Sequence, residues 1–271
     1  MLCQPDDIIL VLPSDHLIRK TEQYEEAIIQ AKKLAEEGFI VTFGCQPSYP
    51  ETGFGYIEAD GENVLAFHEK PSLEIAEEYF RSEKHFWNSG MFCFKAATLL
   101  EELQIYSPDI YETSKQLIEK LPSTISQEIT LPEKDLLQIP SISIDYAIME
   151  HSTKIKVVPC DLGWSDLGSF DSLFAEFRKK DSSSNISLTT QPISTRSSHN
   201  NLVIGSNRKI ALIGVDDLII ADTPDALLIL KKDHSQQVKE IVSELKTENP
   251  TLLEYHTLVH RPWGSYEVLM D

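Results

Sequence analysis

Glycine is scarce in this sequence, and the shortage limits the nucleotide chemistry that these residues can support by themselves. The 271 residues include 11 glycines. Neither G-x-G-x-x-G nor G-x-x-x-x-G-K-S/T, the loops whose backbone N–H groups cradle nucleotide phosphates, occurs among them. Gly53 and Gly55 form the sole G-x-G, and no third glycine completes it. Any nucleotide chemistry must therefore borrow a phosphate loop or proceed without one.

Positive charge is also in short supply, which excludes some classes of partner. The sequence has 24 Lys and Arg against 43 Asp and Glu, a formal net charge of −19 and a pI near 4.8. Broad binding to nucleic acid or to an anionic membrane surface needs a basic face, so we expect neither partner. A phosphorylated small substrate stays compatible, because a pocket can be locally basic or hold a metal ion on an acidic protein.

Long apolar runs and paired cysteines are absent as well. No run approaches the roughly 18 residues of a membrane span, and the first residues lack the basic start of a signal peptide. Cys3, Cys45, Cys93 and Cys160 lie far apart with no C-x-x-C pair. Together these features predict reduced thiols, most of them packing residues, in a cytoplasmic protein.

The first part of the chain has the alternation of an α/β domain. The apolar run at residues 8–12 suits a strand buried on both faces of a parallel sheet. Residues 21–39 have the periodicity of an amphipathic helix that stops at Gly38, and a second apolar strand follows at residues 39–43. Further strands and helices alternate as far as residue 180, so we expect one α/β domain over residues 1–180 with a mostly parallel, Rossmann-like sheet.

The composition changes after residue 180. Ten of the eighteen residues from 181 to 198 are Ser or Thr, which indicates a linker, although Ile186, Leu188 and Ile193 could mark short strands instead. Four short apolar segments and an amphipathic helix follow. Strands that recur about every eight residues favour a small all-β unit over residues 181–250, either a meander or a β-helix. Residues 251–271 end after a few residues of apparent strand.

Two aspartates follow predicted strands of the α/β domain, where ligands bind in open sheets. Asp15 comes just after the first strand, and Asp166 comes a few residues after the strand that begins at Ile155. Two carboxylates that converge from separate loops can hold one Mg²⁺. The alternative is that each aspartate caps a turn.

Three further segments carry groups that could recognise a sugar phosphate. The loop of Gly53 and Gly55 would let backbone N–H groups approach a ligand. Glu69 and Lys70 set an acceptor for hydroxyl groups beside a cation, and Asn88 offers an amide. Plain turns and a solvated charge pair are the alternatives. The histidines at positions 68, 85 and 151 are scattered without metal-ligand spacing, which favours structural roles.

The order of these segments resembles that of a known enzyme family. The segments are, in sequence, Leu12-Pro13-Ser14-Asp15-His16, Val41-Thr42-Phe43-Gly44, Pro50-Glu51-Thr52-Gly53-Phe54-Gly55-Tyr56-Ile57, Glu69-Lys70-Pro71, Phe86-Trp87-Asn88-Ser89-Gly90-Met91-Phe92, Ile144-Asp145-Tyr146-Ala147-Ile148-Met149-Glu150 and Gly163-Trp164-Ser165-Asp166-Leu167-Gly168-Ser169. Over nearly the whole chain this series resembles the mannose-1-phosphate guanylyltransferases, within the sugar nucleotidyltransferases.

The resemblance implies a role for each candidate residue. Asp15 and Asp166 match the carboxylates that bind the catalytic Mg²⁺, and Lys70 matches a lysine near the sugar phosphate, so these three would be the catalytic residues. The substrate-binding positions would be Gly55, Glu69, Asn88 and Asp145. The implied reaction is attack by a mannose 1-phosphate oxygen on the α-phosphorus of GTP, which releases pyrophosphate. The second domain would be the family's small left-handed β-helix, which supports dimerisation.

The sequence also departs from the family. The family's glycine-rich loop lies well before the Leu-Pro-Ser-Asp-His segment, whereas only residues 1–11 precede that segment here. The tail at residues 261–264 resembles the beginning of a cupin-type isomerase domain. We therefore expect a truncated nucleotidyltransferase domain at 1–180, a β-helix domain at 181–250 and the start of an isomerase domain at 251–271.

This departure predicts weak guanylyltransferase activity for the chain alone. The alternative function is a non-catalytic subunit that binds sugar phosphate or mediates oligomerisation. We expect a homodimer, or pairing with an N-terminal fragment or a full-length homologue that it completes or regulates. Phosphomannose isomerase activity is disfavoured, because no cluster of histidines follows Trp263.

Overall fold

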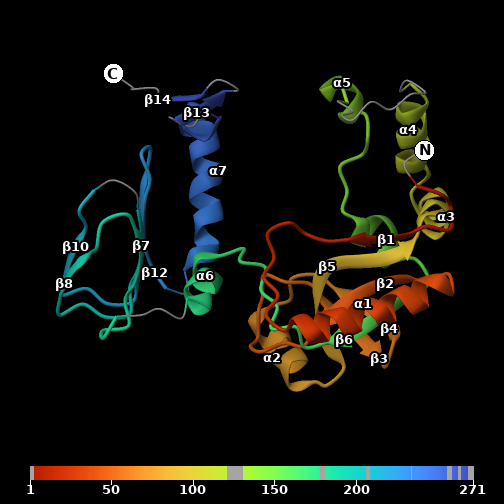
Figure 1. Cartoon of the computed structure of the whole chain (residues 1–271), viewed down its shortest axis with the longest axis horizontal. Coiled ribbons are helices and arrows are strands. Elements are labelled where there is room, and N and C mark those ends of the chain that lie inside the picture. Colours follow the sequence, from red (N-terminus) through yellow and green to blue (C-terminus); the bar gives the residue numbers. More distant parts are fainter. Residues whose placement is uncertain are drawn as a thin grey trace. The chain divides into compact units, whose positions relative to one another are not determined.

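A computed structural model describes the backbone of most of the chain. The described residues are 3–120, 131–177, 181–205, 208–232, 234–254, 258–261 and 264–267. They divide into two compact units, Met1–Asp166 and Leu167–Asp271. Each unit is described by itself below, and Figure 1 shows the elements of both.

The first unit contains a six-stranded sheet with helices on both faces. Its elements are β1 (Ile8–Val11), α1 (Thr21–Glu36), β2 (Ile40–Cys45), β3 (Tyr56–Asp60), β4 (Asn63–His68), α2 (Leu73–Arg81), β5 (His85–Lys95), α3 (Ala96–Tyr106), α4 (Pro108–Glu119), α5 (Glu133–Leu136), the π-helix η1 (Asp145–Met149) and β6 (Ile155–Cys160). The strands follow the order β1-β5-β2-β6-β4-β3, and β3 also pairs with β5. The predicted α/β class is confirmed.

The prediction of a mostly parallel sheet is wrong. Among the described strands of this sheet, β2 and β6 pair in parallel, whereas the β1–β5, β2–β5, β3–β4, β3–β5 and β4–β6 pairs are antiparallel. The strand–helix–strand unit β1-α1-β2 exists, but β5 enters between its two strands and runs against both. Apolar runs do not reveal this insertion, because a buried strand has the same composition in either direction.

The two faces of the sheet are covered by different helices. On one face Ala27, Ala31 and Leu34 of α1 pack against Phe43 and Met91 of the central strands. On the other face Phe92 and Phe94 of β5 meet Leu99 and Leu103 of α3 and residues 147–149 of η1. Successive residues of a strand point to opposite faces, so β5 supplies core side chains to both layers.

Strand β1 is less buried than its sequence predicts. Among the described strands it pairs with β5 alone, and it lies at the end of the strand order. Its first three residues are half-buried, while Val11 and the following Leu12 are 40% and 46% exposed. The prediction of a strand buried on both faces is therefore wrong for β1, whereas all residues of β2 are buried.

The second unit is built mainly from short strands. Its elements are α6 (Phe170–Glu176), β7 (Ile186–Thr189), β8 (Ser194–Arg196), β9 (Leu202–Gly205), β10 (Ala211–Ile213), β11 (Leu218–Asp222), β12 (Leu227–Lys231), the 3₁₀-helix η2 (Ser235–Gln237), α7 (Val238–Glu248), α8 (Thr251–Glu254), β13 (Leu258–Arg261) and β14 (Gly264–Glu267). Strands β7, β9 and β11 pair in parallel, as do β8 and β10, while β12 is antiparallel to β11.

This pairing is that of a β-helix, one of the two architectures left open by the strand spacing. Ile186, Leu202 and Ile219 stand in register on β7, β9 and β11 and stack in one buried core. Since β7 and β8 fall within the Ser/Thr-rich stretch, the linker interpretation of residues 181–198 is wrong, and the alternative of short strands is confirmed. Phe170 and Phe174 of α6 pack against the same core.

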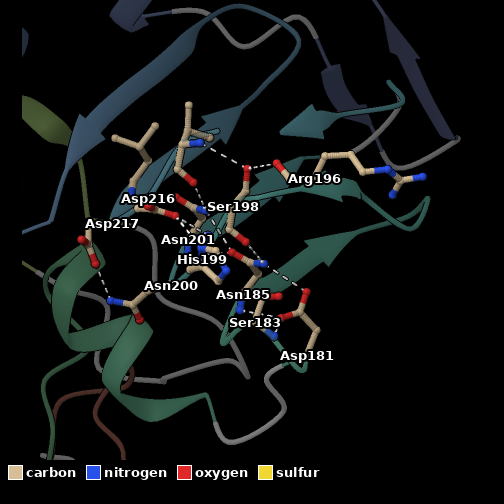
Figure 2. A network of polar contacts seen from close by, with 12 residues as sticks. Asp181, Ser183, Asn185, Arg196, Ser198, His199, Asn200, Asn201, Asp216 and Asp217 are labelled. Atoms are coloured by element: carbon tan, nitrogen blue, oxygen red, sulfur yellow. Dashed lines mark hydrogen bonds and ion pairs between the residues drawn. The ribbon is translucent and has the colours of Figure 1, made fainter. Parts of the chain in front are cut away.

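Each turn of the β-helix repeats the same backbone conformation before its strand. Ser184, Asn200 and Asp217 all have positive φ, at 62°, 59° and 58°. The residue that follows is Asn185 in one turn and Asn201 in the next, and both are buried. Asn201 donates to Asn185 Oδ1 at 2.9 Å and to the Val215 carbonyl at 2.9 Å, so an amide ladder links successive turns (Figure 2).

The structure bears on the expectations about membrane spans and cysteines. Among the described residues, no helix combines the length and hydropathy needed to cross a bilayer. The four cysteines are free thiols, with Cys45 and Cys93 buried and the other two half-buried. Residues 178–180, at the end of the predicted α/β domain, and residues 262–263 of the tail lie outside the described residues.

Candidate functional site

Four residues predicted to bind substrate converge on one place in the first unit. Gly55 precedes β3, Glu69 follows β4, Asn88 lies within β5 and Asp145 begins η1. The Asn88 backbone N–H donates to the Gly55 carbonyl at 2.8 Å, and the Asn88 side-chain Nδ2 donates to Asp145 Oδ1 at 2.8 Å. Residues that are far apart in the sequence thus meet around Asn88 of β5.

Gly55 is the residue that permits this convergence. A Cβ atom at position 55 would lie 2.8 Å from Glu69 Oε2 and 3.6 Å from Asn88 Cβ. Such a contact with Glu69 is closer than carbon and oxygen atoms tolerate, so a larger residue would push the carboxylate away. The absent side chain of Gly55 therefore leaves room for Glu69 at the site.

Asp145 is the most perturbed acid of this group. Burial raises the pKa of its carboxyl, the hydrogen bond from Asn88 opposes the rise, and the nearby Glu69 carboxylate adds to it. Asp145 also opens a π-helical turn, a rare conformation that is frequent at functional sites. A half-buried carboxylate with a raised pKa in such a turn is a strong hydrogen-bond acceptor for a ligand that carries hydroxyl groups.

Glu69 and Lys70 add opposite charges beside this group. The Lys70 Nζ lies 3.0 Å from Glu69 Oε1, and the two side chains are 61% and 38% exposed. Lys70 has a φ of 41°, in the left-handed region that costs free energy for a residue with a side chain. The pair is therefore held in a strained turn, and its ammonium group is open to an anionic ligand.

The two predicted metal ligands lie on loops that are linked by backbone hydrogen bonds. Leu17 and Ser165 exchange hydrogen bonds at 2.8 and 3.0 Å, which places the Asp15 loop antiparallel to the loop of Asp166. The link continues where the backbone N–H of Lys20 donates to Leu162, and the Lys20 ammonium pairs with Asp161. That pairing lowers the pKa of Asp161.

The burial of these two carboxylates differs. Asp15 is exposed and Asp166 is half-buried, and each lies within two residues of the Leu17–Ser165 pair. Leu167, directly after Asp166, has a φ of 51°. Carboxylates that keep access to water suit a hard divalent cation, which retains several water ligands. The donor set of the two loops therefore fits such an ion.

An aromatic cluster connects the metal loops with the glycine loop. Trp164 stands edge-on to Phe54, with ring centroids 5.2 Å apart, and its indole Nε1 donates to His16 Nδ1 at 3.1 Å. Phe54 in turn contacts Trp87, which precedes Asn88. The rings give the Asp15, Asp166 and Gly55 loops a common rigid support.

Sequence reasoning missed residues that position this site. The Glu51 carboxylate accepts from the Gly53 N–H at 2.7 Å, and the Tyr56 hydroxyl donates to the Glu51 carbonyl at 3.0 Å, which together close the glycine loop. Glu51 falls within one of the recognised segments, but its acceptor role depends on the folded loop. Thr42 of β2 lies behind Asn88, at 3.5 Å from its Oδ1.

The histidines are not all scattered, as their spacing suggested. His151 stacks on Tyr106, as a structural residue does. His68 and His85, in contrast, lie with ring centroids 5.9 Å apart and share the neighbour Tyr79. The prediction of scattered positions is wrong for this pair, because β3 aligns the end of β4 with the start of β5.

Comparison with known families and structures shows the family of the chain. The nucleotidyl transferase family model matches residues 1–183, which is more than half of the chain. The chain belongs to the nucleotidyl transferase family. A second model, the MannoseP isomerase/GMP-like beta-helix domain, matches residues 196–245. The two matches cover the sheet with the candidate site and most of the β-helix.

Individual relatives show which members of the family this chain is similar to. The mannose-1-phosphate guanylyltransferase of Salmonella muenchen is 41% identical over 270 residues, 97% of this chain and 56% of the relative. Mannose-1-phosphate guanylyltransferase 2 of Escherichia coli O157:H7 is 40% identical over 97% of this chain and 57% of the relative. The chain thus spans a little over half the length of these relatives. The resemblance expected from the order of the segments is confirmed.

A solved structure supports the same fold. A crystal structure from Thermus thermophilus, described as mannose-1-phosphate geranyltransferase, matches with a TM-score of 0.74 and 32% identity, over 88% of this chain and 70% of that chain. The nucleotidyltransferase fold followed by a β-helix is therefore confirmed. Nucleotidyltransferases of this kind use a divalent metal, in agreement with the donor set of the two loops.

Proposed function

We propose that this chain takes part in guanylyl transfer from GTP to mannose 1-phosphate, and that it supplies the sugar-phosphate half of the site. The observation that carries the proposal is the convergence of Gly55, Glu69, Asn88 and Asp145. Relatives named mannose-1-phosphate guanylyltransferase at about 40% identity support it. The products would be GDP-mannose and pyrophosphate.

Each polar group of the site has a role in this proposal. The carboxylates of Glu69 and Asp145 accept hydrogen bonds from sugar hydroxyls, and Asn88 can both donate and accept. Lys70, with its exposed ammonium group, neutralises the sugar phosphate as a catalytic residue. Binding in this geometry orients the phosphate oxygen that attacks GTP, which is the main contribution a protein makes to phosphoryl transfer.

Asp15 and Asp166 would hold the divalent metal, which we propose is Mg²⁺. Mg²⁺ favours a few carboxylates together with water and substrate phosphates, and the two carboxylates keep access to water. When bound, the metal offsets negative charge that develops on the phosphates. The Leu17–Ser165 pair and the hydrogen bond from Trp164 to His16 hold the two loops together.

Calorimetric titration of the chain with mannose 1-phosphate tests the binding half of the proposal. We expect Lys70→Ala to weaken binding by about tenfold, since a hydrogen bond to a charged group contributes about 1.5 kcal/mol or more. Lys84→Ala is the matched control, because Lys84 is an exposed lysine of the same unit. Equal affinity of both variants and the parent protein would contradict the assigned site.

Turnover tests the catalytic half. The 271 residues contain no glycine-rich phosphate loop, so we expect slow GDP-mannose formation from GTP, Mg²⁺ and mannose 1-phosphate by the chain alone. Fast turnover that Asp166→Ala abolishes would contradict this expectation. Binding without turnover, restored by a full-length homologue, would favour the alternative of a completing or regulatory subunit.

We also propose that the chain pairs with a second copy of itself through β12. This strand ends its sheet, and Leu227 and Ile229 on it are 56% and 58% exposed beside a groove of about 500 Å³. An edge strand can pair with its own copy about a two-fold axis, which covers such a face. The substitutions Leu227→Lys and Ile229→Lys together should give a monomer by analytical ultracentrifugation, whereas Ile241→Lys on α7 should not.

A further inference from the structure

Three potential metal ligands, none of them on the Asp15 or Asp166 loop, meet on the sheet of the first unit. They are Glu58 on β3, His68 at the end of β4 and His85 at the start of β5. One ligand atom from each side chain lies within 4.8 Å of the other two. His68 Nε2 is 3.5 Å from Glu58 Oε2. Two imidazoles and one carboxylate are a common ligand set for zinc.

The sheet register places these side chains on one face. Glu58 is directly opposite His85 in the β3–β5 pair, and Tyr56, two residues earlier on β3, is opposite His68 in the β3–β4 pair. Residues two apart on a strand point to the same side, as do residues directly opposite each other. Three adjacent strands thus hold the ligands before any ion binds, which reduces the entropy lost on binding.

Neighbouring groups orient both imidazoles. His85 Nδ1 lies 2.9 Å from Ser82 Oγ, so a proton on Nδ1 leaves the Nε2 lone pair for a metal ion. Tyr79 of α2 stacks on the His85 ring at 4.1 Å, with 11° between the ring planes, and also contacts the His68 ring at 5.0 Å. These contacts limit the rotation of both rings.

We propose that Glu58, His68 and His85 bind a divalent transition-metal ion of the Zn²⁺ type. Zinc–nitrogen bonds of about 2.0 to 2.1 Å require ligand atoms about 3.3 Å apart, so small side-chain rotations close the cluster around the ion. Glu58 and His68 are 34% and 32% exposed, which gives the ion a path of entry and leaves one position for water. The ion would join three strands at one point.

This site differs in chemistry from the pair Asp15 and Asp166. Imidazole ligands favour zinc and its neighbours in the transition series, whereas Mg²⁺ prefers oxygen ligands and retains its water. Zn²⁺ should therefore occupy the histidine cluster in the presence of Mg²⁺. Because His68 directly precedes Glu69, a bound ion would also restrain the turn of Glu69 and Lys70.

Titration of the chelator-treated full chain with Zn²⁺, in a buffer that contains Mg²⁺, tests the proposal. We expect one Zn²⁺ per chain at this site and a loss of affinity of at least tenfold in His68→Gln and in His85→Gln. His151→Gln is the matched control, because this exposed histidine belongs to the same unit and stacks on Tyr106. Circular dichroism without metal checks that each variant is folded.

Two further measurements keep the test decisive if a histidine variant unfolds. Ser82→Ala retains all three ligands and should weaken Zn²⁺ binding by about tenfold through the lost orientation of His85. Co²⁺ bound in place of zinc should give the visible bands of a four-coordinate ion without sulfur-to-metal charge transfer. Binding that is unchanged in these variants, a sulfur band from cysteine ligands, or no binding at about 1 mM Zn²⁺ would overturn the proposal.

Discussion

Two asparagines, one in each unit, place the same side chain in different surroundings. Asn201 in the β-helix is fully buried, donates to Asn185 Oδ1 and to the Val215 carbonyl, and accepts from the Leu218 N–H at 2.9 Å. Asn88 in the sheet is half-buried and makes one short side-chain bond, 2.8 Å to Asp145, while its Oδ1 has longer contacts with Gly90 and Thr42.

This difference separates a structural polar group from a candidate binding group. A buried amide with every donor and acceptor paired has nothing left to offer a ligand, and its loss leaves its partners unsatisfied. An accessible amide with long contacts can exchange them for bonds to a substrate. The two units can therefore be distinguished by whether substitution changes stability or ligand affinity.

The largest expected effect is on the stability of the β-helix. Asn201→Ala would leave the Leu218 N–H and the Val215 carbonyl without their partner, at a cost of about 3 kcal/mol in the free energy of unfolding. Urea denaturation monitored by circular dichroism measures the change. Ser187→Ala, which alters an exposed hydroxyl of the same unit, should shift it by less than about 0.5 kcal/mol. Equal losses of unfolding free energy in the two variants would contradict a structural role specific to Asn201.

Asn88→Ala should show the opposite pattern. We expect mannose 1-phosphate affinity to fall by about tenfold, equivalent to about 1.4 kcal/mol, because the site loses a donor and the restraint on Asp145. The free energy of unfolding should change by less in Asn88→Ala than in Asn201→Ala. Asn63→Ala on β4, where the amide is exposed, is the control for calorimetry. A larger loss of stability than of affinity would assign Asn88 a structural role.

Gly55→Ala should weaken the sugar site by a smaller amount. The new Cβ would displace the Glu69 carboxylate, and we expect a fewfold loss of mannose 1-phosphate affinity, about 1 kcal/mol. The effect should nearly vanish in a Glu69→Ala background, where no carboxylate remains to be displaced. A double-mutant cycle measures this coupling, and additive losses would show that Gly55 acts through its backbone instead.

The smallest expected effect is the pH dependence contributed by Asp145. Since burial raises the pKa of its carboxyl in the folded state, the folded protein holds this proton more tightly than the unfolded chain. The stabilisation is complete below the unfolded pKa, near 3.8, and is lost as the pH rises through the raised folded value. Asp145→Asn should remove this decline in chemical denaturation curves, and an unchanged pH profile would contradict the burial of the charge.

Much of the fold followed from local patterns. The amphipathic helix α1 ends at Glu36, and Gly38 just beyond it has a φ of 93°, the left-handed conformation that stops a helix. Pro108 marks the start of α4, and the four apolar segments after residue 200 form β9 to β12. Periodicity and turn residues act over a few positions, so they are visible in a single sequence.

Strand order and direction were not predictable in the same way. β5 lies between β1 and β2 and runs antiparallel to both, where a parallel sheet was expected. Packing between segments that are distant in the sequence determines this position. The Ser/Thr-rich start of the β-helix looked like a linker because its stabilising contacts, such as Asn185 with Asn201, lie between turns and not within one.

The candidate site was likewise predictable from the sequence in part only. The order of the segments and its resemblance to a known family predicted the segments with Asp15, Gly55, Glu69, Asn88, Asp145 and Asp166. Order and residue type belong to the chain before it folds. Which groups touch was decided by the tertiary structure. The contact of Asn88 with Asp145 and the meeting of Glu58 with two histidines depend on strand register, which brings distant residues together through packing that no local pattern encodes.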